Sequence, residues 1–203
     1  MKRFAFTMLE LVFVIIVIGI LAVLAMPNFT TNPLQQAAEQ VARDIRYTQH
    51  LAMMDDKYDP ADPAWFRENW QIDFTSTPSN VFYTIFSDMD HGGNADDGEI
   101  ALDPLTREKM YVDLINGTSD RTNLKDKYGI SQVTFQGGCN IGNELSFDAL
   151  GRPYYFLTSA APTSANIYQY ILAQDCNITL THPTEGNAIL IIKPETGYVS
   201  INY

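Results

Sequence analysis

Hydrophobic residues are concentrated at the start of the chain, where residues 11–26 are apolar at every position except Gly19. The run extends back to residue 6 across a single acidic residue, Glu10. A helix over residues 6–26 would be roughly 31 Å long, which is about the hydrocarbon thickness of a lipid bilayer. The pattern therefore predicts a transmembrane helix near the N-terminus.

The charges beside this run predict its orientation. Lys2 and Arg3 precede it, and the next basic residue is Arg43. Basic residues favour the cytoplasmic side of a membrane. We therefore expect a cytoplasmic N-terminus, a single transmembrane helix over residues 6–27, and a C-terminal part that lies outside the cytoplasm.

Three kinds of segment fit this pattern: a cleaved signal peptide, a plain membrane anchor, or a specialised assembly helix. The small residues just before Met26 could serve as a signal-peptide cleavage site. Glu10 favours the assembly helix instead. A carboxylate in an apolar run costs about 2.5 to 3.5 kcal/mol on insertion, and such residues usually have a functional partner.

A second helix, with one apolar face, is predicted over residues 28–56. Asn32 before Pro33 is typical of an N-cap followed by a first-turn proline. Because Pro27 lacks an amide hydrogen, we expect a kink or break between the two helices. The small or apolar positions of the predicted face are Leu34, Ala37, Ala38, Val41, Ile45, Thr48 and Ala52.

Beyond residue 57 the pattern changes to short extended runs, in which β-branched and aromatic residues alternate with polar ones. The predicted strands cover residues 70–74, 81–86, 109–114, 131–135, 144–147, 154–157, 168–173, 177–181, 188–192 and 198–201. The last two form a closing hairpin. The sequence therefore predicts an α+β fold, with a long N-terminal helix packed on an antiparallel β-sheet domain over residues 57–203.

Composition and charge narrow the possible functions. The 203 residues include 13 basic and 24 acidic ones, with a formal net charge of −11. The basic residues are scattered, so nucleic acid is not expected as the main partner. The sequence has no nucleophile elbow, phosphate loop or dinucleotide fingerprint, so we expect no enzymatic activity. A secreted enzyme with an unrecognised site is one alternative for the function of the chain.

Residues 2–10, with the sequence KRFAFTMLE, resemble the class III signal of type IV prepilins and type II secretion pseudopilins. This resemblance implies a leader peptide over residues 1–5, which a prepilin peptidase removes between Ala5 and Phe6. It also implies N-methylation of the new terminus at Phe6. The chain departs from the family at Ala5, because the residue before the cut is usually glycine.

The same resemblance implies how the helix assembles. Glu10 becomes the fifth residue of the mature chain, where the family has a near-invariant glutamate. Gly19 and Pro27 lie where the family commonly has helix-breaking residues. Cleavage would create an ammonium group at Phe6 that can pair with Glu10 of a neighbouring subunit and set the register of assembly. Alternatively, Glu10 reaches the cytoplasmic face as a solvated residue.

The resemblance implies a structural pilin-like subunit that assembles into a type II secretion pseudopilus or a type IV pilus. Residues 145–153 and 191–199 are similar to sheet segments of minor pseudopilins of the H type, which favours a minor component. Its partners would be the prepilin peptidase, other pilin or pseudopilin subunits, the inner-membrane assembly platform and the lipid bilayer. It would span the bacterial inner membrane once, with its C-terminal domain in the periplasm or in an extracellular filament. The main alternative is an exported binding module with a plain anchor that does not polymerise.

Two features of the exported part are candidate sites. Cys139 and Cys176 are the only cysteines, and in an exported domain such a pair indicates a disulfide, although two buried free thiols are the alternative. Residues 88–99 space oxygen side chains around Gly93 as in a twelve-residue calcium loop. A solvated acidic turn is the alternative there, because Gly92 and Ala95 depart from the EF-hand pattern. The candidate Ca²⁺ ligands are Asp88, Asp90, Asn94, Asp96 and Glu99.

Overall fold

The structure is a computed structural model that describes residues 7–25, 32–112, 121–155 and 166–203. The chain divides into two compact units, Met1–Thr31 and Asn32–Tyr203. The first contains helix α1, Met8–Ala25, and the second contains helix α2, Pro33–Met54, together with the strands. Each unit is described by itself below.

Helix α1 exposes its apolar side chains along the part where they are described. Leu11, Phe13 and Ile15 are 54%, 66% and 61% exposed. With 18 residues, α1 is shorter than the helix expected over residues 6–27 and measures about 27 Å at 1.5 Å per residue. Across the described stretches of the chain, no helix has both the length and the apolar character needed to cross a membrane. The expected transmembrane helix is therefore not found in this part of the structure.

Helix α2 confirms the predicted amphipathic helix and its cap at Asn32, and residues 28–31 of the predicted range lie outside the described residues. The Asn32 side chain accepts a hydrogen bond from the Gln35 N–H at 3.0 Å, which caps the helix, and Pro33 occupies its first turn. The helix ends at Met54, two residues before the predicted boundary. All seven predicted face residues are buried, and so are Gln40, Ala42 and Asp44.

The strands form two four-stranded antiparallel sheets, where the sequence predicted one sheet domain. The first sheet has the order β2-β1-β4-β5 and the second has the order β3-β6-β7-β8. The bounds of the first sheet are β1 Gln71–Ser76, β2 Val81–Phe86, β4 Glu144–Phe147 and β5 Pro153–Tyr155. Those of the second sheet are β3 Gln132–Gly137, β6 Cys176–His182, β7 Gly186–Ile192 and β8 Val199–Asn202. The short helices are η1 Trp65–Glu68, α3 Leu124–Tyr128 and η2 Ile167–Tyr170.

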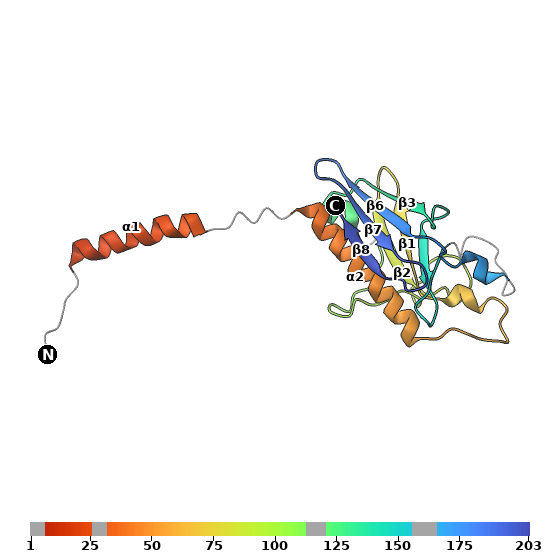
Figure 1. Ribbon diagram of the computed structural model, residues 1–203. Coiled ribbons are helices and arrows are strands. Elements are labelled where there is room, and N and C mark those ends of the chain that lie inside the picture. The colour runs from red at the N-terminus through yellow and green to blue at the C-terminus, as the bar shows by residue number, and fades with distance from the viewer. Residues whose placement is uncertain (1–6, 26–31, 113–120, 156–165) are drawn as a thin grey trace. The chain divides into compact units, whose positions relative to one another are not determined.

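One hydrophobic core joins α2 to both sheets. Helix α2 contacts β1 and β4 of the first sheet and β6, β7 and β8 of the second (Figure 1). Ile45 of α2, Ile72 of β1 and Leu190 of β7 belong to the same buried cluster. A smaller cluster contains Phe66 and Ile167 from η1 and η2. The apolar stripe of α2 is thus the common surface on which the two sheets meet.

A buried polar network also lies on this face of α2. Asp44 is fully buried and accepts hydrogen bonds from the Tyr83 hydroxyl, from the Arg121 guanidinium and, at 2.8 Å, from Gln40 Nε2. Arg121 also pairs with Asp103. Burial and the Asp44 carboxylate raise the pKa of Tyr83 well above its usual value. The tyrosine hydroxyl therefore keeps its proton and acts as a donor to Asp44.

Two predicted strands are wrong. Lys109 makes only an isolated bridge to Leu102, and no strand is assigned to the described residues 109–112. Residues 167–170 form the 3₁₀ helix η2, in which Ile167 is buried and Tyr168 is 62% exposed. The pattern of residues 168–173 contains β-formers, but burial of Ile167 against the Phe66 cluster favours the helical turn. Ile171 then makes a single bridge to the first sheet.

Candidate functional site

The acidic loop of residues 88–99 brings three of the five predicted calcium ligands together. One oxygen from each of Asp88, Asp90 and Glu99 lies within 4.8 Å of the others. Asp88 is fully buried, Glu99 is 5% exposed, and Asp90 is exposed. Carboxylate oxygens that converge in this way are the ligands that Ca²⁺ prefers.

The other two predicted ligands lie elsewhere in the loop. The Asp96 carboxylate is not part of this group, and its backbone N–H donates to Glu99 Oε2 at 3.1 Å. Asn94 lines a hollow beside the first sheet. The twelve-residue spacing therefore predicted the core of the acidic group but not its full set of ligands.

Backbone N–H groups hold the three carboxylates in place. The Gly93 N–H lies 3.1 and 3.2 Å from the two oxygens of Asp88, and the Gly92 N–H donates to Asp90 Oδ1 at 2.7 Å. Glu99 Oε1 accepts from the Asp90 N–H at 3.0 Å. Gly93 has a φ of 79°, which favours glycine. The loop thus closes on itself while its carboxylates face one another.

The charge around Asp88 is partly compensated by η1. Arg67 Nη2 lies 3.5 Å from Asp88 Oδ2. Burial raises the pKa of Asp88, whereas the Gly93 hydrogen bond and the Arg67 charge act in the opposite direction. A bound divalent cation would therefore share Asp88 with Arg67.

A second group of possible metal ligands consists of Asp62, Glu68 and His91. His91 Nε2 lies 3.5 Å from Asp62 Oδ2 and 3.4 Å from Glu68 Oε1. The three side chains come from a loop, from η1 and from the acidic loop. Sequence spacing gives no sign of this group, because only the tertiary fold brings these segments together.

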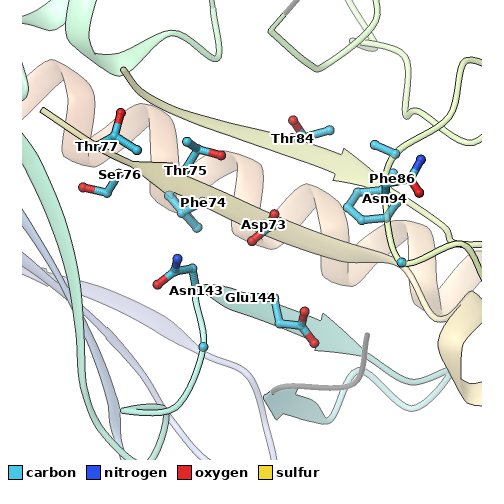
Figure 2. A pocket seen from close by; sticks show the side chains of 13 residues that line it. Asp73, Phe74, Thr75, Ser76, Thr77, Thr84, Phe86, Asn94, Asn143 and Glu144 are labelled. Atoms are coloured by element: carbon cyan, nitrogen blue, oxygen red, sulfur yellow. The ribbon is translucent and has the colours of Figure 1, made fainter. Parts of the chain in front are cut away.

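A hollow of about 500 Å³ lies beside the first sheet and is lined by carboxylate, amide and hydroxyl side chains (Figure 2). Asp73 of β1 and Glu144 of β4 face each other across the strand pair. Burial, followed by the charge of Glu144, raises the pKa of Asp73 to about 6. Thr84 of β2 is the other cross-strand neighbour of Asp73. The alternation along β1 shows that Asp73 and Phe74 lie on opposite faces, but it does not reveal the pairing with Glu144.

The predicted assembly residues are only partly described. Glu10 lies in the first turn of α1 and is exposed, and its backbone N–H lies 3.3 Å from Thr7 Oγ1. Gly19 lies within α1, and a Cβ there would meet no atom within 4 Å. The predicted cleavage and methylation residues, Ala5 and Phe6, and the predicted break at Pro27 are outside the described residues.

The structure joins Cys139 and Cys176 in a disulfide with a Cα–Cα distance of 5.1 Å. Gly137, the last residue of β3, pairs with Cys176 at the start of β6. The chain between the two cysteines leaves the second sheet, forms β4 and β5 of the first sheet and η2, and then returns. The disulfide therefore closes the base of this excursion.

No protein-family model matches the chain, and no curated protein or solved structure matches it at a significant level. Function is therefore inferred from the residues and from their geometry.

Proposed function

We propose that the chain is a structural, pilin-like subunit that a prepilin peptidase cleaves and N-methylates. In this proposal the mature subunit assembles into a type II secretion pseudopilus or a type IV pilus, as a minor component. The subunit resides in the bacterial inner membrane before assembly. The observation that carries the proposal is the exposed apolar surface of α1.

The surface of α1 supports an assembly role because it cannot remain in water. Its described apolar side chains are exposed on every side, and Glu10 is the only charged residue in the helix. A helix that is apolar all round is normally covered by lipid or by other helices. Before assembly, α1 and its flanking residues would be covered by the lipid bilayer. After assembly, they would be covered by the helices of neighbouring subunits.

The position of Glu10 supports a role in register. It lies in the first turn of α1, four residues after the proposed new N-terminus at Phe6. A carboxylate and an ammonium group from neighbouring subunits would each be costly alone in an apolar surrounding, and they offset this cost when paired. Pairing of this kind would fix the axial position of one subunit on the next.

The second unit supports the role of an exported domain. Helix α2 is covered by two sheets on its apolar face, and a disulfide closes one excursion of the chain. Disulfides persist in oxidising compartments such as the periplasm. The outer loops of this domain would contact other subunits or partner proteins.

The first test is the mass of the N-terminal peptide from cells with and without prepilin peptidase. The proposal predicts a mature chain that begins at methylated Phe6 and is lost without the peptidase. A chain that retains Met1 in both strains would contradict it, and so would a chain that begins near Met26.

The second test is assembly of Glu10→Leu in cells. The variant should be inserted and processed but absent from purified filaments. Glu39→Leu is the matched control, because Glu39 is exposed on α2 and the change in charge and size is the same. Normal co-assembly of Glu10→Leu would contradict the proposed pairing of Glu10 with the N-terminus of a neighbouring subunit.

A second candidate function is an anchored, exported binding module that calcium orders and that does not polymerise. The observation that favours it is the convergence of Asp88, Asp90 and Glu99. In this case Ca²⁺ would replace part of the backbone hydrogen bonding within the loop. The chain would then contact its partner through loops of the exported domain.

Calorimetry with Ca²⁺ tests this candidate on the full chain in an uncharged detergent. The expected result is a saturable heat that Glu99→Gln abolishes. Glu108→Gln is the control, because it removes one exposed carboxylate outside the loop. The absence of heat at millimolar Ca²⁺, or equal heats for both variants, would contradict calcium binding here.

A further inference from the structure

We infer that an aromatic, acidic hollow beside η1 and η2 binds a basic segment of a partner protein, with a lysine or arginine side chain inserted among the rings. The hollow has a volume of about 550 Å³. Its rings come from Tyr58, Trp65 and Tyr168, and its carboxylates come from Asp59 and Asp62. This inference does not depend on filament assembly.

The hollow is built between two segments that lie far apart in the sequence. Residues 58–65 form one wall, and Ile167 and Tyr168 of η2 form the other. The two short helices lie side by side because Phe66 of η1 and Ile167 share the smaller buried cluster (Figure 1). The packing beneath the hollow therefore fixes its shape.

The aromatic rings are available for contact with a ligand. Tyr58 and Tyr168 are each 62% exposed, although burial would normally be favourable for such large apolar surfaces. Tyr58 packs edge-on against Trp65 with ring centroids 5.2 Å apart and an interplanar angle of 76°. Aromatic faces arranged around a cavity attract ammonium and guanidinium groups.

The protein already places one cation on a ring of the hollow, Tyr168, and another on a nearby ring, Trp70. The Arg152 guanidinium lies 6.0 Å from the centroid of the Tyr168 ring, and the Lys57 ammonium lies 5.9 Å from that of Trp70. Both distances are within the range of cation–π interactions. Arg152 lies beside an adjoining depression and is not among the lining residues of the aromatic hollow.

The carboxylates make the hollow complementary to a positive charge. Asp59 Oδ1 accepts the Ala61 N–H and Asp62 Oδ1 accepts the Ala64 N–H, both at 2.8 Å. These bonds fix both side chains at the rim. None of the described residues that line the hollow is basic, although His91 Nε2 lies 3.5 Å from Asp62 Oδ2. The net charge of −11 would also attract a basic partner over a longer range.

The size of the hollow indicates a peptide rather than a small ion. A volume of about 550 Å³ is in the range of ligand pockets and exceeds what one ammonium group needs. An extended segment can place one basic side chain between the rings while its backbone follows the rim at Pro60 and Pro63. A neutral sugar is the other class of ligand that uses exposed rings, but the carboxylates favour a cation.

The experiment is a titration of the full chain, in an uncharged polyoxyethylene detergent, with acetyl-Gly-Lys-Gly-amide. The readout is the indole N–H signal of Trp65 in the NMR spectrum of the ¹⁵N-tryptophan-labelled protein. Trp70 is the internal control, because its Nε1–H donates to Asp55 at 3.0 Å outside the hollow. We expect a saturable shift of Trp65 alone, with a dissociation constant of about 1 mM that rises with salt.

Three variants with matched controls test the recognition. Asp59→Asn and Asp62→Asn keep the acceptor oxygen of each turn and remove its charge, and each should weaken binding about two- to fivefold. Asp175→Asn is the control for net charge. Tyr58→Leu should weaken binding by a similar factor of about two to five. Tyr198→Leu is its control, because both tyrosines are 62% exposed.

Several outcomes would overturn the inference. An equal shift of Trp65 with acetyl-Gly-norleucine-Gly-amide would mean that the hollow does not recognise charge. A shift with methyl glucoside but not with the lysine peptide would make it a sugar site. Equal effects of Asp59→Asn and Asp175→Asn would assign the binding to bulk charge.

Discussion

Replacement of Asp44 by alanine is expected to lower the free energy of unfolding by about 3 to 5 kcal/mol, because its carboxylate joins α2 to Tyr83 of β2 and to Arg121. The side chain is fully buried and accepts hydrogen bonds from Gln40, Tyr83 and Arg121. The change removes the acceptor and leaves the donors in place. The cost therefore arises mainly from the groups that remain.

The magnitude follows from the burial of those groups. Tyr83 is fully buried, so the loss of its acceptor costs about 1 to 3 kcal/mol, and the loss of the acceptor of the buried Gln40 amide adds about 1 kcal/mol. The Arg121 side chain is 25% exposed and keeps its pairing with Asp103, so its contribution lies at the lower end of that range. Asp44→Asn keeps one acceptor oxygen and should cost about half as much as Asp44→Ala.

The assay is urea unfolding of the full chain in an uncharged detergent, followed by near-ultraviolet circular dichroism. Asp175→Asn is the control. It breaks an exposed ion pair with Lys193, whose atoms are 2.6 Å apart, and should cost less than about 1 kcal/mol. A double-mutant cycle with Tyr83→Phe then isolates the coupling to Asp44.

Two results would refute this reasoning. The first is a decrease in the free energy of unfolding for Asp44→Ala that is no larger than the decrease for Asp175→Asn. The second is additive behaviour of Asp44→Ala and Tyr83→Phe, because a shared hydrogen bond requires the double variant to lose less than the sum of the two single losses.

Three further predictions concern the same unit. Reduction of the Cys139–Cys176 disulfide should lower the free energy of unfolding by about 3 to 4 kcal/mol by the loop-entropy model, and urea midpoints before and after reduction measure this. Burial and the charge of Glu144 raise the pKa of Asp73 to about 6. The unfolded state therefore loses this proton at a lower pH than the folded state does, and the free energy of unfolding should fall as the pH rises from about 4 to about 6. Asp73→Asn should remove this pH dependence and, after allowance for partial solvent exposure, raise the free energy of unfolding by about 1 to 2 kcal/mol at pH 7. An unchanged pH dependence would show that Asp73 is not its source. Asn32→Ala should cost about 1 kcal/mol through loss of the α2 N-cap, and no change in thermal midpoint would contradict it.

The sequence predicted best those elements that local patterns determine. The buried spacing from Leu34 to Ala52 follows from helix periodicity. The cap at Asn32 and the proline at the start of α2 follow from the local chemistry of a helix N-terminus. Strand β2 agrees with its predicted bounds because its aromatic and β-branched residues lie between turn residues. The closing hairpin of β7 and β8 was also predicted correctly.

The division into two sheets could not be predicted from these patterns. Strands β4 and β5 lie between β3 and β6 in sequence but pair within the first sheet. Alternation shows that a segment is extended and does not reveal its partner. The disulfide closes this excursion, and the cysteine pair indicated a link without indicating which strands it encloses.

Sequence spacing predicted a cluster of possible metal ligands only where the ligands come from one loop. Asp88, Asp90 and Glu99 are within twelve positions of one another, and their convergence follows from a glycine turn at Gly93. Asp73 and Glu144 come from distant segments of the chain, and so do the aromatic residues that line the hollow beside η2. Only the tertiary structure brings such residues together.

The location of these groups separates binding from stability within the unit Asn32–Tyr203. Along β1, Ile72 and Phe74 pack into the core that contains α2, whereas Asp73 lies on the opposite face of the first sheet. That opposite face is approached by loops and by η1 and η2, which carry the carboxylates and exposed rings. Changes on these loops should therefore alter binding with little effect on the core, whereas changes on α2, such as Asp44→Ala, should alter stability. If the proposed filament forms, its cohesion and its partner contacts would then depend on separate surfaces of one subunit.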